Sequence, residues 1–306
     1  MNAPVIGFAE GEARLDWLDL VQALQDGHRL PRAEIGDTLL QRGDDTLLSR
    51  AAWIDGLGLA VKSATVFPGN TARGKPSING GVSLYSDTDG VLEAIIDFHL
   101  VTKWKTAGDS LLGALNLARC DSRKILIVGA GTVGHSLRQA YGAGFPRAEF
   151  SIWNRSADRA EEFAAYHPGM TVAQSLEAAV GAADIITSAT MTREPLIKGT
   201  WLRPGQHLDL IGAYRPDMRE ADDTALRRAR IFVDSRETTI GHIGEIKTPL
   251  DTGVITPAEV LADFYDLAAG GFRRQSDDEI TLFKNGGGAH LDLMTSRYIL
   301  NAWAGA

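Results

Sequence analysis

A glycine-rich turn between an apolar run and a helix-like segment most constrains the fold of this chain. The stretch IVGAGTVGHS contains Gly129, Gly131 and Gly134 in the spacing G-x-G-x-x-G. The run KILIVGA predicts a buried strand, and the segment after the turn predicts a helix. Such glycines permit a tight turn, a close approach of the backbone to a pyrophosphate and close packing of helix on strand. The helix N-terminus, at Thr132 and Val133, offers free N–H groups to that anion. We therefore predict a dinucleotide site in preference to a purely structural turn.

Strands and helices alternate after this turn as far as the segment IFVDSR. That rhythm predicts a doubly wound parallel sheet of the Rossmann type, with right-handed crossovers. The tail ends in an amphipathic helix that we expect to return to the first domain. The predicted fold class is α/β, with a Rossmann domain over residues 119–274 and a discontinuous α+β domain for substrate binding and dimerisation over residues 1–118 and 275–306.

The end of the second strand of the alternating block distinguishes between dinucleotides. A site for NAD usually carries Asp or Glu here, which accepts hydrogen bonds from the ribose hydroxyls. This chain has IWNRS instead, with no carboxylate to repel a 2′-phosphate and with an arginine that can pair with one. We therefore predict NADPH in preference to NADH, the alternative being that the arginine is a solvated residue at a helix start. The predicted cofactor contacts at the end of this strand are Asn154, Arg155, Ser156 and Arg159. Two further predicted contacts, Thr190 and Met191, follow a later strand of the block, in TSATMTREPLI.

Charge and composition exclude several classes of partner. The chain has 306 residues and a formal net charge of −8, so it has no general attraction to nucleic acid or to an anionic membrane. No apolar run reaches the length of about 20 residues that spans a bilayer, and the N-terminus lacks a basic segment followed by an apolar core. The only cysteine, Cys120, excludes an internal disulfide. We expect a cytoplasmic protein.

The first domain contains a lysine within an otherwise apolar strand. LGLAVKSATVF reads as a buried strand, and GGVSLYSDTDGVLEAIIDF reads as two strands around an Asp-Gly turn. A helix is predicted from Thr102 to about Arg119. A buried ammonium is costly unless it is paired, so Lys62 should face a cleft that holds an anion. The alternative is a lysine that extends to solvent from a strand edge.

The ordered set of motifs resembles the ornithine cyclodeaminase/mu-crystallin family. The matching segments are VKSATVFPGNTARGKPSINGGVSLYSDTDGVLEAIID, TKWKTAGDSLLGALNLAR, the glycine turn, IWNRSADRAEEFA, SATMTREPLI, HLDLIGAYRPDMREADD, RIFVDSRE and DEITLFK. The resemblance implies a homodimer in which each chain has a split substrate domain and a Rossmann domain. It also implies an NAD(P)H-dependent oxidoreductase acting on 2-amino or 2-imino carboxylates.

The resemblance assigns roles to three basic residues. Lys62 matches the active-site lysine of the family, and Lys105 stands where many members have an arginine that binds the substrate carboxylate. Many members have a second arginine that binds the substrate carboxylate. This chain has no matching arginine, because Asp37 lies near the corresponding position. Arg50, or alternatively Arg42, is the candidate substitute. The predicted catalytic residue is therefore Lys62, and the predicted substrate-binding residues are Lys105 and Arg50.

One departure from the cyclodeaminase pattern narrows the reaction. Tyr214, in IGAYRPDMRE, stands where the cyclodeaminase has an Asp proposed as its acid/base residue, and we place Tyr214 among the cofactor contacts. Losing that carboxylate argues against deamination with ring closure, which needs several proton transfers at nitrogen. GAYRPDMRE and IWNRS also resemble the ketimine-reductase members of the family, which tend to use NADPH.

From these residues and the family resemblance we predict that the protein is an NADPH-dependent reductase of cyclic imino acids. The expected substrates are Δ1-pyrroline-2-carboxylate, Δ1-piperideine-2-carboxylate or both, reduced to L-proline and L-pipecolate. No metal is expected. The alternatives are an ornithine cyclodeaminase, an amino acid dehydrogenase of the alanine type, and a non-catalytic NADPH-binding protein that keeps the fold in the manner of a lens crystallin.

Overall fold

The computed structural model describes residues 3–305, and the chain divides into two compact units. Unit 1 comprises Met1–Lys105 and Gly287–Ala306, and unit 2 comprises Thr106–Gly286. These limits differ from the predicted boundaries at 118/119 and 274/275. The first differs because the helix α3 (Phe98–Leu117) contributes residues to both units. The second differs because a strand beyond residue 275 belongs to the sheet of unit 2.

Unit 1 is built on a six-stranded sheet whose strands are antiparallel except for the pair β1 and β6. The hairpin β2–β3 and the strand β4 form its long strands, and Lys62 of β4 pairs in register with Arg50 of β3. In spatial order the strands are β1 (Val5–Ile6), β6 (Leu92–Asp97), β5 (Ile78–Tyr85), β4 (Gly58–Val66), β3 (Asp45–Ile54) and β2 (Glu34–Arg42).

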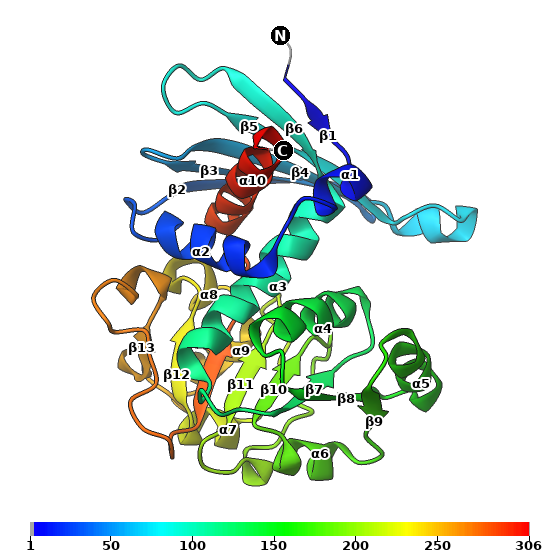
Figure 1. The fold of residues 1–306 in the computed structure, drawn as a ribbon, viewed down its shortest axis with the longest axis vertical. Helices are drawn as coiled ribbons and strands as arrows, with labels where there is room; N and C mark the ends of the chain where they lie inside the picture. The colour runs from blue at the N-terminus through cyan, green and yellow to red at the C-terminus, as the bar shows by residue number, and fades with distance from the viewer. Residues whose placement is uncertain (1–2, 306) are drawn as a thin grey trace. The chain divides into compact units, whose positions relative to one another are not determined.

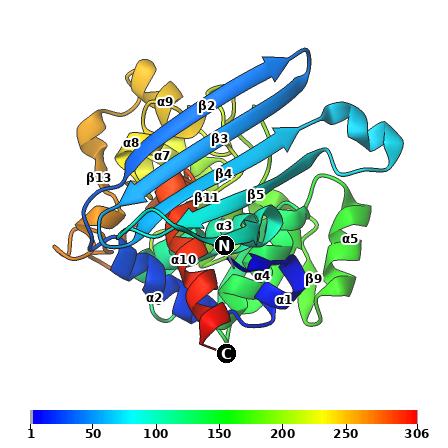
Figure 2. The same ribbon diagram turned by 90° about the horizontal axis from the view of Figure 1, so that it is seen from above.

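The C-terminal helix α10 (Ala289–Ala304) packs against strands β3, β4 and β5 on one face of this sheet (Figure 2). The helix α2 (Trp17–Gly27) packs in turn against α10 and begins at Asp16, whose side chain accepts hydrogen bonds from the backbone of Leu18 and Asp19. The short helix α1 (Phe8–Glu12) precedes it. Among the described residues of unit 1, no helix covers the face of the sheet opposite α10 (Figure 2).

Unit 2 is built on an eight-stranded sheet in which every pairing is parallel (Figure 1). Its central strand β7 is buried from Ile125 to Val128, as a strand covered on both faces should be. In spatial order the strands are β13 (Val260–Ala262), β12 (Arg230–Val233), β14 (Thr281–Lys284), β11 (His207–Leu210), β10 (Ile185–Ser188), β7 (Lys124–Val128), β8 (Glu149–Trp153) and β9 (Met170–Val172).

Helices connect these parallel strands, and several begin at a side-chain cap. Ser156, Ser175 and Asp222 each accept a hydrogen bond from a backbone N–H of the first turn. The helices of unit 2 are α4 (Thr132–Gly144), α5 (Ala157–Tyr166), α6 (Leu176–Ala182), α7 (Asp223–Arg228), α8 (Arg236–Thr239) and α9 (Gly244–Asp251). Short 3₁₀ helices in the two units are η1 (Pro68–Arg73), η2 (Gly199–Trp201), η3 (Pro257–Glu259) and η4 (Phe264–Asp266).

The predicted fold class is confirmed: unit 2 has the doubly wound parallel sheet, and unit 1 combines helices with a mainly antiparallel sheet. The predicted start of α3 at Thr102 is wrong, because the helix already begins at Phe98. Its first turn, FHLV, is mostly apolar and continues the apolar character of the preceding strand. No helix among residues 3–305 combines the length and the apolar character needed to cross a membrane.

Candidate functional site

The glycine turn of unit 2 has the geometry that an anion site needs. Gly129 follows β7 with φ +111°, and a Cβ atom there would lie 2.8 Å from the carbonyl oxygen of Ala189. Gly131 is the N-cap of α4, has no side-chain cap, and has open space where a Cβ would stand. A Cβ on Gly134 would collide with the carbonyl of Gly129. The exposed first turn, at Thr132, therefore fits a pyrophosphate group.

Asn154 joins the end of β8 to this turn. Its Oδ1 accepts a hydrogen bond from the backbone N–H of Ala130 at 3.2 Å, and its Nδ2 donates to the carbonyl oxygen of Ser156 at 3.1 Å. The Ser156 hydroxyl caps α5 by accepting from the N–H of Arg159. Arg155 and Arg159 are exposed beside this cap. Asn154, and no carboxylate, thus stands directly after β8, and the role of the two arginines in cofactor binding stays a prediction.

A buried glutamate, Glu220, holds the two loops that follow β10 and β11. It accepts hydrogen bonds from the Ser188 hydroxyl at 2.6 Å, from both the N–H and the hydroxyl of Thr190 at 2.7 Å, and from the N–H of Gly212 at 2.6 Å. Thr190 is therefore fixed through its side chain. Two other predicted cofactor contacts are not held in this way. Met191, in the loop after β10, is exposed, and Tyr214, in the loop after β11, is 58% exposed.

Two further charged groups are buried near Glu220. Glu245, at the start of α9, accepts from the backbone N–H of Glu220 at 2.6 Å and from that of Ala221 at 3.0 Å. Lys284, at the end of β14, donates to the carbonyl oxygen of Leu210 at 2.8 Å. Burial, reinforced by the charge of Glu220, raises the pKa of Glu245 to about 7, and burial lowers the pKa of Lys284.

In unit 1 the two predicted lysines meet at one carboxylate. Lys62 Nζ donates to Asp292 Oδ1 at 2.9 Å, and Lys105 Nζ lies 3.3 Å from the same oxygen. Lys105 also donates to the carbonyl oxygen of Gly287 at 2.9 Å. The side chains of all three charged residues are at most 8% exposed. The Lys62 ammonium lies 4.7 Å from the centre of the Phe98 ring.

The structure places Arg50 beside this group and Arg42 away from it. Arg50 donates through Nη1 to the carbonyl oxygen of Gly287 at 3.2 Å, so it shares an acceptor with Lys105. Its Nε donates to Asp37, at 3.1 Å from Oδ2. Arg42 is 83% exposed in its side chain and pairs with a neighbour across the β2–β3 turn.

Burial and mutual charge set the protonation of this group. Burial lowers the pKa of Lys62 to about 8, an effect that Asp292 opposes and that Lys105 and Arg50 reinforce. Burial acts to raise the pKa of Asp292, but the two lysines outweigh it and hold that pKa below its ordinary value. His290, also on α10, has its pKa lowered by burial to about 3 and is therefore neutral. The site thus presents ammonium groups to an incoming anion.

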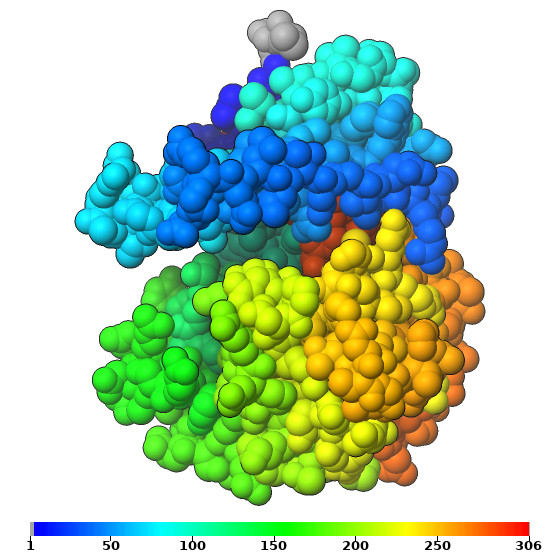
Figure 3. All heavy atoms as spheres, turned by 180° about the vertical axis from the view of Figure 1, so that it is seen from behind, coloured from blue at the N-terminus to red at the C-terminus, as the bar shows by residue number. Residues whose placement is uncertain are grey.

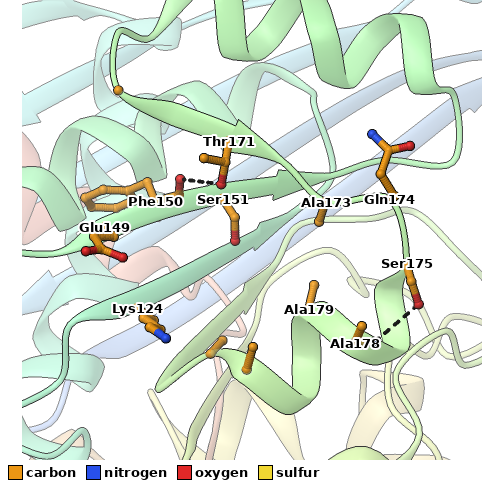
Figure 4. Close-up of a pocket in the computed structure, with 13 residues that line it drawn as sticks. Lys124, Glu149, Phe150, Ser151, Thr171, Ala173, Gln174, Ser175, Ala178 and Ala179 are labelled. Atoms are coloured by element: carbon orange, nitrogen blue, oxygen red, sulfur yellow. Dashed lines mark hydrogen bonds between the residues drawn. The ribbon is translucent and has the colours of Figure 1, made fainter.

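A cavity of about 610 Å³ in unit 2 lies elsewhere (Figure 4). Lys124 and Glu149 at its rim are the first residues of β7 and β8, whereas the glycine turn follows the last residue of β7. The remaining lining residues are Phe150, Ser151, Gly169, Thr171, Ala173, Gln174, Ser175, Ala178, Ala179, Ala182 and Ala183. None of them is a predicted cofactor contact. Within residues 3–305, no group of three or more His, Cys, Asp or Glu side chains is placed to hold a metal ion.

Sequence reasoning missed Asp292 and Glu220 as members of these clusters. Asp292 lies in GAHLDLM, an acidic residue among apolar ones in a predicted helix, which is the same signal that singled out Lys62 in its strand. Glu220 lies in a largely polar loop sequence, DMREADD, where nothing local distinguishes it from the other charged residues.

Comparison with known proteins matches residues 53–306 to the ornithine cyclodeaminase/mu-crystallin family model. The chain is 53% identical to a Δ1-pyrroline-2-carboxylate reductase of Paracoccus denitrificans, over 98% of this chain and 97% of that protein. Its fold matches an archaeal alanine dehydrogenase dimer with bound NAD (TM-score 0.90, 26% identity, 100% of this chain and 97% of that one). Its fold also matches a Thermococcus litoralis Δ1-pyrroline-2-carboxylate reductase in complex with NADH and L-proline (TM-score 0.87, 24% identity, 98% of this chain and 97% of that one). The chain therefore belongs to the ornithine cyclodeaminase/mu-crystallin family.

Proposed function

We propose that this protein reduces Δ1-pyrroline-2-carboxylate and Δ1-piperideine-2-carboxylate to L-proline and L-pipecolate with NADPH. The observation that carries the proposal is the buried pair of ammonium groups, Lys62 and Lys105, on the single carboxylate of Asp292. Two positive charges and one negative charge leave one positive charge, which a monocarboxylate substrate neutralises. The 53% identical relative, named a Δ1-pyrroline-2-carboxylate reductase, supports this choice of substrate.

The roles of the residues follow from their charge and burial. Lys62 and Lys105 bind the substrate carboxylate in a site screened from water, where each charge-assisted hydrogen bond is strong. Arg50, which shares the Gly287 carbonyl with Lys105, adds a third cation at the edge of the same group. A nicotinamide cofactor, when bound, would supply the hydride for the imine carbon. The imine nitrogen carries its proton before transfer, taken from solvent or from Lys62, so hydride addition completes the amino acid.

We propose NADPH as the preferred cofactor. Arg155 and Arg159 are exposed beside the Ser156 cap, and Asn154 occupies the place of the carboxylate that a site for NAD usually has. An arginine fork can donate two hydrogen bonds to a 2′-phosphate. The glycine turn and the first turn of α4, with Thr132 and Val133, would hold the pyrophosphate.

A substrate panel with both cofactors tests the reaction. The protein is mixed with NADPH or NADH and with each cyclic imine, and with L-ornithine, L-alanine and L-proline plus the oxidised cofactors. We expect loss of NADPH absorbance with the cyclic imines and faster turnover than with NADH. Ammonia and proline from L-ornithine with NAD would instead show a cyclodeaminase. Tight NADPH binding without any turnover would show a binding protein.

We propose that two copies of the chain associate through the open face of the six-stranded sheet. Side chains alternate along a strand, and Lys62 points toward α10, so its odd-numbered neighbours in β4 point to the opposite face. Across the strands this face carries Leu40, Leu47, Trp53, Leu59 and Val61.

Figure 3 shows β2 and β3 (blue) at the surface. Leu40, Leu47 and Trp53 are 59%, 37% and 48% exposed, which is unusual for such residues in a monomer. The dimeric state of the archaeal alanine dehydrogenase supports the proposal.

The cytoplasm is the compartment that we propose. The only cysteine, Cys120, is exposed and free, so the fold needs no disulfide. Reduction by NADPH also suits a reducing compartment. Fractionation of cells followed by detection of the protein tests this, and recovery in an extracellular fraction would contradict it.

A further inference from the structure

A single carboxylate oxygen serves two buried lysines in unit 1. Asp292 Oδ1 lies 2.9 Å from Lys62 Nζ and 3.3 Å from Lys105 Nζ. The other oxygen, Oδ2, is buried and has no hydrogen-bond partner among the described residues. Three different elements supply the three groups: Lys62 comes from β4, Lys105 from α3 and Asp292 from the first turn of α10.

The helix α10 packs against α2, β3, β4 and β5, and the charges that act on Asp292 are those of Lys62, Lys105 and Arg50. Lys62 lies on β4, Arg50 on β3, Lys105 on α3 and His290 on α10. Arg50 is itself paired with Asp37 on β2, and His290 is neutral because burial lowers its pKa to about 3. Arg32 acts on His290 from the segment before β2. Asp292 is therefore the buried negative charge that faces both lysines.

Two ammonium groups that share one buried site repel each other, and both burial and the charge of Lys105 favour loss of the Lys62 proton. A carboxylate between them offsets both effects. Without it, the first consequence would be loss of the Lys62 proton, because Lys62 is the lysine whose pKa burial already lowers to about 8. A neutral Lys62 binds a substrate carboxylate poorly.

We propose that Asp292 is a positioning residue that holds Lys62 and Lys105 on one carboxylate oxygen and keeps Lys62 charged for substrate binding. The proposal deepens the reductase function and rests on it only for the identity of the anion that the lysines bind. Asp292 acts through the lysines and does not itself contact the substrate.

Titration of Lys62 in the ligand-free protein tests the proposal without any turnover. The protein is prepared with lysine labelled with ¹³C at Cε, and Lys62→Arg identifies the resonance of Lys62. In Asp292→Asn, we expect the midpoint of the Lys62 titration to move to lower pH by about one pH unit or more. An unchanged midpoint in a folded Asp292→Asn protein would overturn the proposal.

A matched control removes another ion pair that anchors α10. Arg297 of α10 pairs with Glu93 of β6 at 2.6 Å, away from the two lysines. Glu93→Gln should therefore leave the Lys62 midpoint in place, even if it lowers stability to the same extent as Asp292→Asn. A shift of equal size in both variants would show a general effect of loosening α10 and would contradict the specific role.

A second variant keeps the test decisive if Asp292→Asn does not fold. Lys105→Met removes the like charge from the same oxygen, so Lys62 should hold its proton to higher pH, opposite to the effect of Asp292→Asn. A downward shift, or none, would contradict the shared arrangement.

Kinetics give the last readout. With Δ1-pyrroline-2-carboxylate, we expect Asp292→Asn to raise KM about tenfold or more, to move the alkaline limb of kcat/KM to lower pH, and to leave the dissociation constant of NADPH within twofold. A wild-type protein that reduces no imine would refute the proposed function alone, because the titration still decides the role of Asp292.

Discussion

Asn154 Oδ1 accepts a hydrogen bond from the backbone N–H of Ala130 at 3.2 Å, and this contact fixes the end of β8 against the glycine turn. The asparagine thus takes a structural place next to the turn while carrying no charge. Arg155, the next residue, is exposed and free to face a ligand phosphate. If the protein prefers NADPH, as proposed, Arg155 is the residue whose substitution should change that preference.

Arg155→Glu should weaken NADPH binding about 10- to 100-fold and NADH binding much less. The reason is that a charge-assisted hydrogen bond contributes about 1.5–3 kcal/mol, and the glutamate also repels the 2′-phosphate. Dissociation constants from the fluorescence of each reduced cofactor measure this. Arg147→Glu, an equal charge change at another exposed position of unit 2, is the control. Equal losses for both cofactors would refute the assignment of Arg155 to the 2′-phosphate.

Glu220→Gln should destabilise the protein by about 1–3 kcal/mol and weaken binding of both cofactors. Glutamine cannot accept hydrogen bonds at both positions, so either the N–H of Gly212 or the donors of Ser188 and Thr190 lose their acceptor. Urea unfolding and cofactor titration measure the two effects. Glu194→Gln, in the exposed part of the loop after β10, should change neither. Unaltered stability in Glu220→Gln would show that the four contacts are dispensable.

Leu47→Asp should convert a dimer into monomers. Leu47 lies on the open face of the six-stranded sheet, and an aspartate there would have to be buried without a partner on association. Analytical ultracentrifugation measures the mass. Leu18→Asp, at a leucine of α2 that is 47% exposed, should leave the dimer intact. If the Leu47→Asp variant remains dimeric, the proposed interface is wrong and the dimer forms through another surface.

Lys62→Ala should abolish reduction of cyclic imines, with a loss of kcat/KM of about 100-fold or more, and leave NADPH binding nearly unchanged. The substitution removes one of the two buried cations that bind the carboxylate and leaves Asp292 with Lys105. Steady-state kinetics and NADPH titration on the same preparation separate the two effects. Loss of NADPH binding would place Lys62 in the cofactor site instead.

The sequence predicted those elements whose pattern depends only on residues that are neighbours in the chain. The strand-and-helix rhythm of unit 2 and the glycine spacing depend on neighbours in the chain, and both predictions agree with the structure. The strand β14 was missed because TLFK enters the sheet between β11 and β12, far away in sequence. The hairpin β2–β3 was also missed. Strand β2 is exposed along almost its whole length, β3 is mostly half-buried, and neither shows the regular alternation of a half-buried sheet.

The cluster in unit 1 shows the same limit. Lys62 could be found because an apolar strand surrounds it, and Lys105 because its motif matches a family position. Their meeting at Asp292 depends on how α3 and α10 pack on the sheet, which no local pattern encodes. Arg50 was preferred to Arg42 from the sequence, but its place opposite Lys62 depends on the register of β3 against β4, which no local pattern encodes.

The pKa of Lys62 predicts how activity depends on pH. Burial lowers that pKa to about 8 in the folded protein, so the ammonium is present below pH 8 and is lost as the pH rises through that value. We therefore expect kcat/KM for the cyclic imines to fall above about pH 8, by about tenfold per pH unit for a single ionisation. Lys62→Arg keeps its charge to much higher pH and should move this limb upward, whatever its effect on the maximum rate. A limb at the same pH in Lys62→Arg would assign it to the imine nitrogen of the substrate, which the variant does not change.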